Sequence, residues 1–89
     1  MSREEAVRRI EQVADESLTE LNLSGLQLQE VPSEIVKCTH LTKLNLSDNQ
    51  ITAIPEVIGK LSNLTKLNLS KNQITAIPEA LDQLKIWIS

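Results

Sequence analysis

The chain has one cysteine and one histidine, Cys38 and His40, which stand two residues apart. A thiolate and an imidazole at this spacing could begin a metal site, but a closed zinc site needs four ligands and no other Cys or His is present. One histidine also leaves no nucleophile–base pair to assemble. The two glycines and three prolines form no phosphate-binding loop. We therefore predict neither an enzyme nor a metal, cofactor or small-molecule substrate site.

Composition narrows the possible partners and the cellular location. The formal charge of -3 gives no basic field for nucleic acid. The first 17 residues are charged throughout and lack the apolar stretch of a secretory signal, and no apolar run approaches the roughly 18 residues of a membrane span. A single cysteine suits a reducing compartment, although it leaves an intermolecular disulfide open. These features predict a cytoplasmic protein that binds neither nucleic acid nor membrane.

Three segments of 23 residues repeat along most of the chain, over residues 18–40, 41–63 and 64–86. The second and third are identical at 16 of 23 positions, which at constant spacing is far beyond chance. Cys38 takes the position that Leu61 and Leu84 hold in the other repeats, so we expect it to be a buried apolar residue. We divide the chain into a helix over residues 1–17 and a repeat region over residues 18–89.

The frame LxxLxLxxNxL followed by IPxxIxxL resembles the leucine-rich-repeat family over residues 18–86. The resemblance implies an α/β fold, a right-handed solenoid with a short parallel β-sheet on its concave face, and a module that binds proteins. The 23-residue repeat is similar to that of intracellular Roco-like proteins, in which it precedes a Ras-like GTPase domain. This sequence has no GTPase segment.

Alternation within each repeat agrees with the resemblance. Leu44 and Leu46 alternate with Lys43 and Asn45, as in a strand with one buried face. The same inward positions in the other repeats are Leu21, Leu23, Leu67 and Leu69. We expect a second set to turn into each coil, namely Leu28, Val31, Ile51, Ile54, Ile74 and Ile77.

Proline marks the convex side of each repeat. Pro32, Pro55 and Pro78 stand at one position of the frame, and a glutamate follows each within two residues. Proline and an acidic residue are typical of the first turn of a helix, so each pair predicts a short helical turn. The inward residues expected from these turns are Ile58, Leu61, Leu81 and Leu84.

Asn49 and Asn72 fill the Asn position of the frame, at the corner after each strand. A side chain with two donors and one acceptor can satisfy backbone groups that a tight corner leaves unpaired, each of which would otherwise cost ~1–3 kcal/mol. We expect the asparagines to form a ladder. Leu26 departs from the pattern in the first repeat, so the ladder should end there, with Leu26 packed beneath the N-terminal helix.

The N-terminal segment predicts a capping helix for the solenoid, whose ends would otherwise expose the core. Ser2 and Glu5 have the spacing of a capping box. Apolar residues fall on one face of the helix, with Val7 at the flank: Ala6, Ile10, Val13 and Ala14. The opposite face carries Arg8, Arg9, Glu11, Gln12 and Asp15. A membrane-surface helix is the weaker alternative, because the apolar face has no large anchoring residues.

The concave face is the usual recognition surface of the family, and its outward residues are polar and nearly uniform here. We expect a solvated sheet surface that binds weakly, because it lacks the Trp, Tyr or Arg anchors of strong interfaces. The candidate binding residues are Glu20, Asn22, Lys43, Asn45, Lys66, Asn68 and Lys71.

The C-terminal end predicts a second surface. Trp87 stands 23 residues after Leu64, at the first position of a fourth repeat. We expect an apolar end at which the flanks of Leu67 and Leu69 are exposed, and patches of this kind mark interaction sites. The residues proposed for self-association, as a homodimer, are Leu84, Ile86, Trp87 and Ile88.

Three functions remain open from the sequence. The first is a non-catalytic interaction module that self-associates through its C-terminal edge, and the second is a monomer that binds a protein or peptide on its concave face. The third is a truncated or engineered repeat fragment without a separate function. The near-identity of the second and third repeats permits engineering, whereas the divergent first repeat favours a natural origin.

Overall fold

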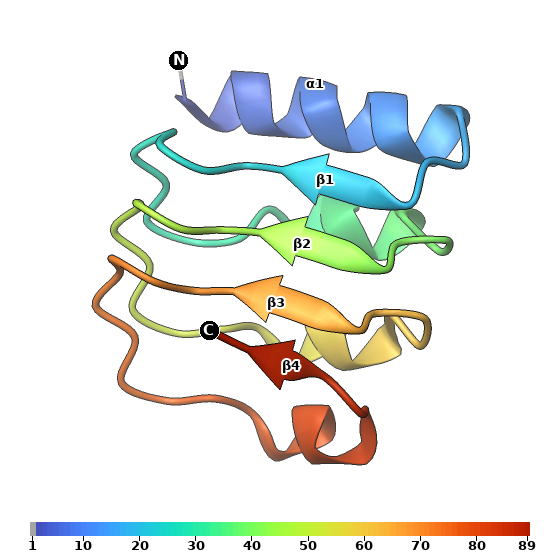
Figure 1. Cartoon of the computed structure of the whole chain (residues 1–89). Coiled ribbons are helices and arrows are strands. Elements are labelled where there is room, and N and C mark those ends of the chain that lie inside the picture. The colour runs from blue at the N-terminus through green and yellow to red at the C-terminus, as the bar shows by residue number, and fades with distance from the viewer. Residues whose placement is uncertain (1) are drawn as a thin grey trace.

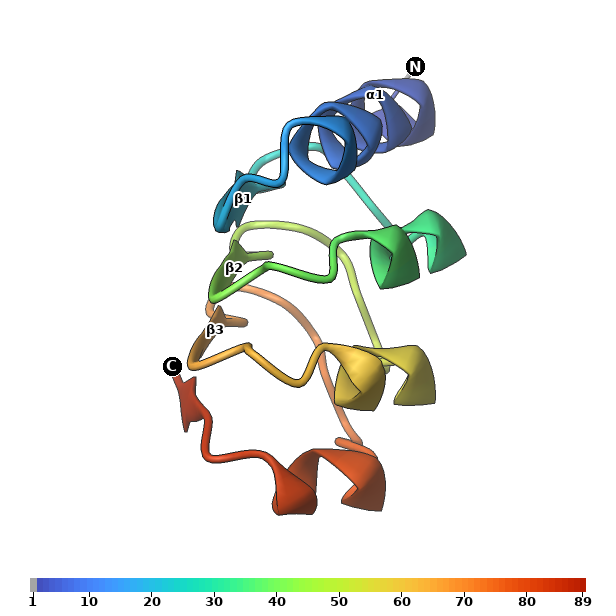
Figure 2. The same cartoon turned by 90° about the vertical axis from the view of Figure 1, so that its right-hand side faces the viewer.

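The computed structural model describes residues 2–89, apart from the side chains of Ser2 and Gln83. It is a right-handed solenoid whose first coil is covered by the helix α1 (Ser2–Asp15). Four strands form one parallel sheet in the order β1-β2-β3-β4. These are β1 (Glu20–Asn22), β2 (Lys43–Asn45), β3 (Lys66–Asn68) and β4 (Trp87–Ile88). Figure 1 shows the strands stacked below α1, and Figure 2 shows the convex turns on the opposite side of the coils.

Each strand repeats the alternation seen in the sequence. Leu21, Leu44 and Leu67 are register partners and point into the coils, where all three are buried. Glu20, Lys43 and Lys66 precede them and point outward. Parallel strands with one aliphatic face require a second layer to cover that face. The convex side of the solenoid supplies it.

The convex side consists of three short 3-10 helices, as the prolines predict. They are η1 (Ser33–Lys37), η2 (Glu56–Lys60) and η3 (Glu79–Gln83), and a proline with extended ψ immediately precedes each one. Ile35, Ile58 and Leu81 point inward from them and are buried. Gly59 lets η2 and η3 stack closely, because a Cβ there would lie 2.9 Å from the Cβ of Ala80.

The helix α1 caps the first coil, as expected. Ala6, Ile10 and Val13 are buried in the same core cluster as the strand leucines. The helix ends in a Schellman motif, in which Leu18 N–H donates to the Val13 carbonyl at 2.9 Å and Ser17 N–H to the Ala14 carbonyl at 3.3 Å. Ser17 takes the positive φ of 52° that the motif requires. Leu18 is therefore part of the helix end and stays exposed, although its counterparts Leu41 and Leu64 are buried.

Ion pairs tie α1 to the first convex turn. Arg3 lies 3.3 Å from Glu34, and Lys37 lies 3.5 Å from Glu11. A hydrogen bond from the backbone N–H of Glu34 lowers the pKa of its carboxyl, with a smaller contribution from Arg3. These pairs are exposed and contribute little to stability, so the apolar face of α1 holds the helix in place.

One expectation for α1 needs revision, and another is not tested. The capping box rests on Ser2, whose side chain lies outside the described residues, so it stays a prediction. Glu5 accepts hydrogen bonds from Arg8 and Arg9, which lower the pKa of its carboxyl. Arg9 does not lie free on the solvent face. Its Nη1 donates to the Asn22 carbonyl at 2.9 Å. The corresponding carbonyls of Asn45 and Asn68 accept from the N–H groups of Leu23 and Leu46 in the coil before them. No coil precedes β1, so Arg9 donates the hydrogen bond that such a coil would supply.

The C-terminal end differs most from the sequence-based expectation. β4 pairs with β3 in the register Lys66↔Trp87 and Leu67↔Ile88, so Trp87 does not take the position of Leu64. In the first two coils a tight turn follows Cys38 and Leu61, whose ψ angles are 67° and 75°. Leu84 has an extended ψ of 140° instead, and the chain runs directly into β4. The third connection is therefore two residues shorter than the repeat predicts.

This register places the apolar residues differently from the prediction. Leu67 and Leu69, expected to be exposed at the C-terminal end, are buried because β4 covers them. Ile77, expected to point into the core, is instead 46% exposed. No helix among residues 2–89 is both long enough and apolar enough to cross a membrane.

Candidate protein-binding groove

The outward side chains of the four strands line an open groove of about 740 Å³ on the concave face. Two columns of side chains run across the strands, because residues in register on neighbouring parallel strands point to the same side. The first column consists of Glu20, Lys43, Lys66 and Trp87, and the second of Asn22, Asn45, Asn68 and Ser89. Six of the seven residues predicted for this face therefore line one groove.

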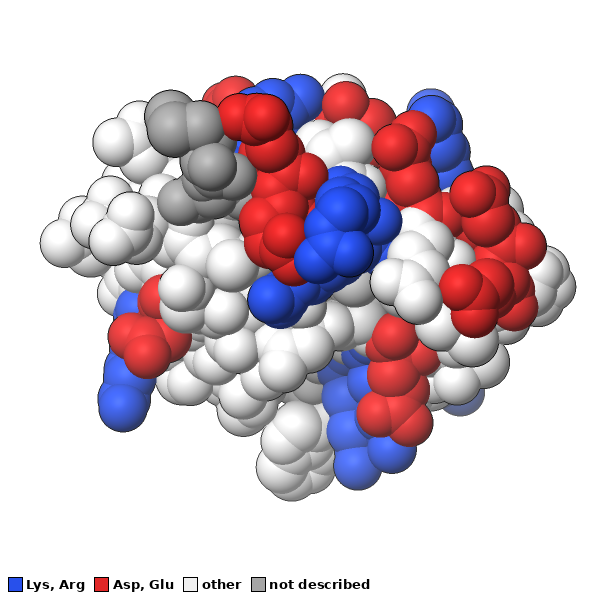
Figure 3. Space-filling model, turned by 90° about the horizontal axis from the view of Figure 1, so that it is seen from above, with Lys and Arg blue, Asp and Glu red and all other residues white. Residues whose placement is uncertain are grey.

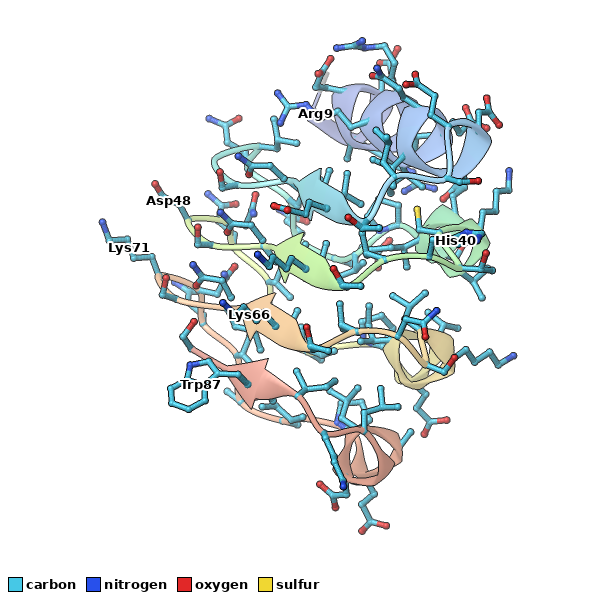
Figure 4. The ribbon with its side chains drawn as sticks, turned by 45° about the vertical axis from the view of Figure 1, so that its right-hand side comes forward. Arg9, His40, Asp48, Lys66, Lys71 and Trp87 are labelled. Carbon is cyan, nitrogen blue, oxygen red and sulfur yellow. The ribbon has the colours of Figure 1, made fainter. Side chains whose placement is uncertain are left out.

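The seventh predicted residue, Lys71, lies outside the groove lining. It follows β3 at the rim with a positive φ of 56°, as Asp48 does after β2 with a φ of 61°. Figure 4 shows both side chains directed away from the strands, beyond the end of the columns. The equivalent residue of the first repeat is Gly25, for which a positive φ carries no steric cost.

Trp87 belongs to this groove, and the prediction that the concave face lacks an aromatic anchor was wrong. Its side chain is 74% exposed and stands beside Lys66 in the register of the sheet. In Figure 4 both side chains project from the same side of the ribbon. The 23-residue period placed Trp87 inside the coil, because a period carries no information about a shorter last connection. Lys85, two residues earlier, gave no signal of the shorter spacing, since at that spacing a lysine takes the position of the buried Leu64.

The groove carries both signs of charge. Lys43 Nζ lies 3.9 Å from the Glu20 carboxylate, an exposed pair at the end of the column nearest α1. Within the described residues, Lys66 has no carboxylate within ion-pair distance. The positive charge of the groove therefore increases from β1 towards β3.

The surface over α1 has a different charge pattern. Seen from the α1 end, acidic and basic side chains alternate over the helix without a large patch of either sign (Figure 3).

The asparagine ladder holds the corners beside the groove, as predicted. Asn49 Oδ1 accepts from the N–H groups of Leu26 and Leu28 at 3.1 and 3.0 Å. Its Nδ2 donates to the carbonyls of Leu23, Leu46 and Ser47. Every buried polar atom among the described side chains is paired, so the corners contain no buried side-chain group without a partner.

Asn72 repeats this arrangement one coil further on. Its Oδ1 accepts from Ile51 N–H at 3.0 Å, and its Nδ2 donates to the Leu46, Leu69 and Ser70 carbonyls. Each asparagine thus binds its own coil and the coil before it. The element before Leu26 is the helix α1 instead of a coil. The backbone groups of α1 are paired within the helix, so an asparagine at position 26 is not needed to pair them. Leu26 is half-buried and packs against the core.

Cys38 and His40, the two residues considered for a metal site, lie in different environments. Cys38 is buried and free, and its Sγ lies 3.5 Å from the Ile10 carbonyl of α1. Burial raises the pKa of the thiol, which favours the neutral form of an apolar residue. His40 is exposed, with Nδ1 3.4 Å from the Thr39 hydroxyl. The expectation that Cys38 is a core residue is confirmed.

The C-terminal edge is the second candidate surface. Leu84 and Ile86 are half-buried against the core, and Ile88 is 41% exposed. Trp87 faces the groove instead of this edge, so the four residues predicted for self-association do not share one surface. Ile77 belongs to the edge and was missed, because its repeat position gave it an inward orientation.

A comparison with models of protein families agrees with this architecture, and two further comparisons give no additional support. A comparison with curated proteins finds no match. Among solved structures, the chain is similar to a leucine-rich-repeat protein of Leptospira interrogans, with 20% identity and a TM-score of 0.42. The match covers 89% of this chain but only 33% of that protein. The family model described as leucine-rich repeat matches residues 16–74 and 39–86, nearly the whole repeat region. The chain therefore belongs to the leucine-rich-repeat family, whose repeats typically form non-catalytic modules for binding proteins.

Proposed function

We propose that this chain binds a segment of another protein in its concave groove, with Trp87 as the anchor. The observation that carries the proposal is the 74% exposure of the only aromatic side chain, in a groove of polar residues. Tryptophan dominates binding energy where an interface buries it. Its large exposed surface has no structural role in the core, which consists of aliphatic residues.

The groove suits an extended segment better than a globular surface. Its walls are the outward side chains of four strands, and its floor is a sheet held by the asparagine ladder. A preformed site of this kind lowers the ordering cost of binding, which falls mainly on the partner. A segment that crosses the strands would contact both columns and end against Trp87.

Selection from a displayed library of random peptides tests this proposal. We expect enriched peptides to lose about tenfold or more in affinity for the Trp87→Ser variant, because its truncation removes the anchor. Val36→Ser is the matched control, since Val36 is another exposed apolar residue but lies on the convex η1. Peptides that bind both variants as well as the wild type would contradict a groove site.

Self-association through the C-terminal edge is a second candidate, and the exposure of Ile77 and Ile88 favours it. β4 is the last strand of the sheet and has no neighbour beyond it among residues 2–89. An edge strand beside apolar side chains can pair with a second copy. A two-fold axis through the edge would give a contact that closes at two copies, with Leu84 and Ile86 beneath it.

Sedimentation equilibrium tests the dimer. At micromolar concentration we expect a dimer that the double change Ile77→Glu and Ile88→Glu converts to a monomer, because two carboxylates would enter the apolar contact. Trp87→Ser should leave this dimer unchanged, since Trp87 faces the groove. A folded monomer of 9.9 kDa over the whole range would rule the dimer out.

Location also remains a proposal. The repeat length resembles that of intracellular Roco-like proteins, and we propose a cytoplasmic protein of this kind. The free thiol of Cys38 supports it, because a reducing compartment keeps an unpaired cysteine reduced. Exclusive recovery from the cell exterior after fractionation would contradict it.

A further inference from the structure

We propose that the groove selects an acidic partner segment, extended and with carboxylates at alternate positions. This inference rests on the proposed function of the groove and adds the chemistry of its partner. The observation that carries it is the orientation of the three asparagines on the groove wall, which present hydrogen-bond donors and keep their acceptors engaged. Lys43 and Lys66 stand beside this row.

Internal hydrogen bonds fix the orientation of each asparagine. Asn22 Oδ1 accepts from Ser24 N–H at 2.9 Å, Asn45 Oδ1 from Ser47 N–H at 2.9 Å, and Asn68 Oδ1 from Ser70 N–H at 3.0 Å. A backbone N–H can only donate, so the oxygen of each amide must face it. The Nδ2 group is thereby turned to the other side. Among the described residues, none of these three Nδ2 groups donates to a protein acceptor.

The other polar groups of the groove lead to the same partner chemistry. Lys66 is a free cation in the part of the chain that the structure describes, and the Trp87 indole N–H donates to no described acceptor. Two acceptors of the groove, in contrast, already have partners. The Glu20 carboxylate lies 3.9 Å from Lys43 Nζ, and the Ser89 carbonyl oxygen accepts from Leu69 N–H at 2.6 Å. A ligand that satisfies this wall must supply acceptors and negative charge.

Spacing favours a protein segment over a single anion. Neighbouring strands lie about 4.8 Å apart, so the row from Asn22 to Asn68 extends over roughly 10 Å. Alternate side chains of an extended peptide project to one side about 6.6 Å apart. Two such carboxylates lie about 1.8 Å further apart than β2 and β3, a difference that the flexible glutamate and lysine side chains can span, and the next residue on that side lies towards Trp87. A leucine there would bury apolar surface against the indole ring.

A comparison of the binding of two synthetic peptides tests the inference. The first has glutamate at alternate positions and a leucine at one end, and the second has glutamine in place of each glutamate. Trp87 is the only aromatic residue, so intrinsic fluorescence reports directly on groove occupancy. We expect the glutamate peptide to shift the emission to shorter wavelengths and to bind about tenfold tighter or more than the glutamine peptide, with an affinity that falls as salt rises.

Variants of the protein test which groove residues cause the preference for the glutamate peptide. The double change Lys43→Gln and Lys66→Gln should reduce the difference between the peptides to about twofold or less, whereas Lys60→Gln on the convex η2 should leave it intact. Asn68→Asp keeps an oxygen for Ser70 N–H but replaces the donor by a negative charge. It should therefore weaken the glutamate peptide roughly tenfold without unfolding the protein. Gln50→Glu adds the same charge at an exposed site outside the groove lining and should have little effect.

The alternative outcomes are distinct. Equal binding of the two peptides would overturn the acidic preference, and so would library peptides that depend on Trp87 but carry no acidic residues. Both results leave the groove as a binding site. A short single-stranded DNA that binds as tightly as the glutamate peptide would replace the protein partner by nucleic acid and overturn the inference. Failure of every probe to bind in a Trp87-dependent manner would overturn the groove function as well.

Discussion

The Ile10→Asp variant is expected to lose cooperative folding under native conditions. Ile10 has no exposed surface and lies where α1 covers the first coil. An unpaired carboxylate there costs on the order of 4 kcal/mol, in addition to the lost apolar contact. A domain of this size has only roughly 5–10 kcal/mol of stability. We expect circular dichroism to show no sharp thermal transition, or one at a much lower temperature.

A matched control separates burial from charge. Gln12→Asp adds the same carboxylate to the exposed side of the same helix and should change the stability by less than about 0.5 kcal/mol. Because the apolar site raises the pKa of the new aspartate, the Ile10→Asp variant should recover stability as the pH falls through that pKa and the carboxyl becomes neutral. Equal melting temperatures for the two variants would show that α1 does not seal the core. Deletion of residues 2–17, which exposes Leu21 and Leu23, should cause aggregation.

The Asn49→Leu variant is expected to lose about 3 kcal/mol of unfolding free energy. Asn49 is 8% exposed and makes five hydrogen bonds to backbone groups of two adjacent coils. Leucine has a similar volume but leaves these groups unpaired, and each one shielded from water costs ~1–3 kcal/mol. Part of this cost is relieved where water reaches the corner. Urea denaturation, monitored by circular dichroism, measures the difference.

Two related changes test the ladder argument. Asn72→Leu should cost less, because Asn72 is half-buried and only four hydrogen bonds hold it. Leu26→Asn should bring no gain, since the element before it is a helix with its own hydrogen bonds. An Asn49→Leu variant as stable as the wild type, or a stabilising Leu26→Asn, would contradict the role of the ladder.

Local patterns were sufficient for most of the fold. Alternation around Leu44 and the spacing of Pro55 predict a strand and a convex turn, and both are observed. The frame position of Asn49 predicts its backbone contacts, because a corner of fixed geometry needs one side chain with donors and an acceptor. These features depend on residues close in sequence or one repeat apart, so a periodic pattern contains them.

The candidate site was predicted only in part. The sequence locates six residues of the groove by their outward positions on the strands, and it excludes a metal pair by the lack of further ligands. It does not reveal that Asn22, Asn45 and Asn68 turn their amide donors towards the groove. That orientation follows from hydrogen bonds to Ser24, Ser47 and Ser70, two residues later in each turn.

The sequence by itself determined the number of coils, the inward residues of the strands and the capped N-terminal end. Only the tertiary structure decided the surface to which Trp87 belongs. The third connection has no tight turn after Leu84, and β4 therefore pairs two residues earlier than the period predicts. Leu64 lies before β3 and is buried, whereas Lys66 lies in β3 and points outward, so a shift of two residues exchanges a core position for an outward one. The shift moves Trp87 from the expected core position to the groove, where the proposed function resides.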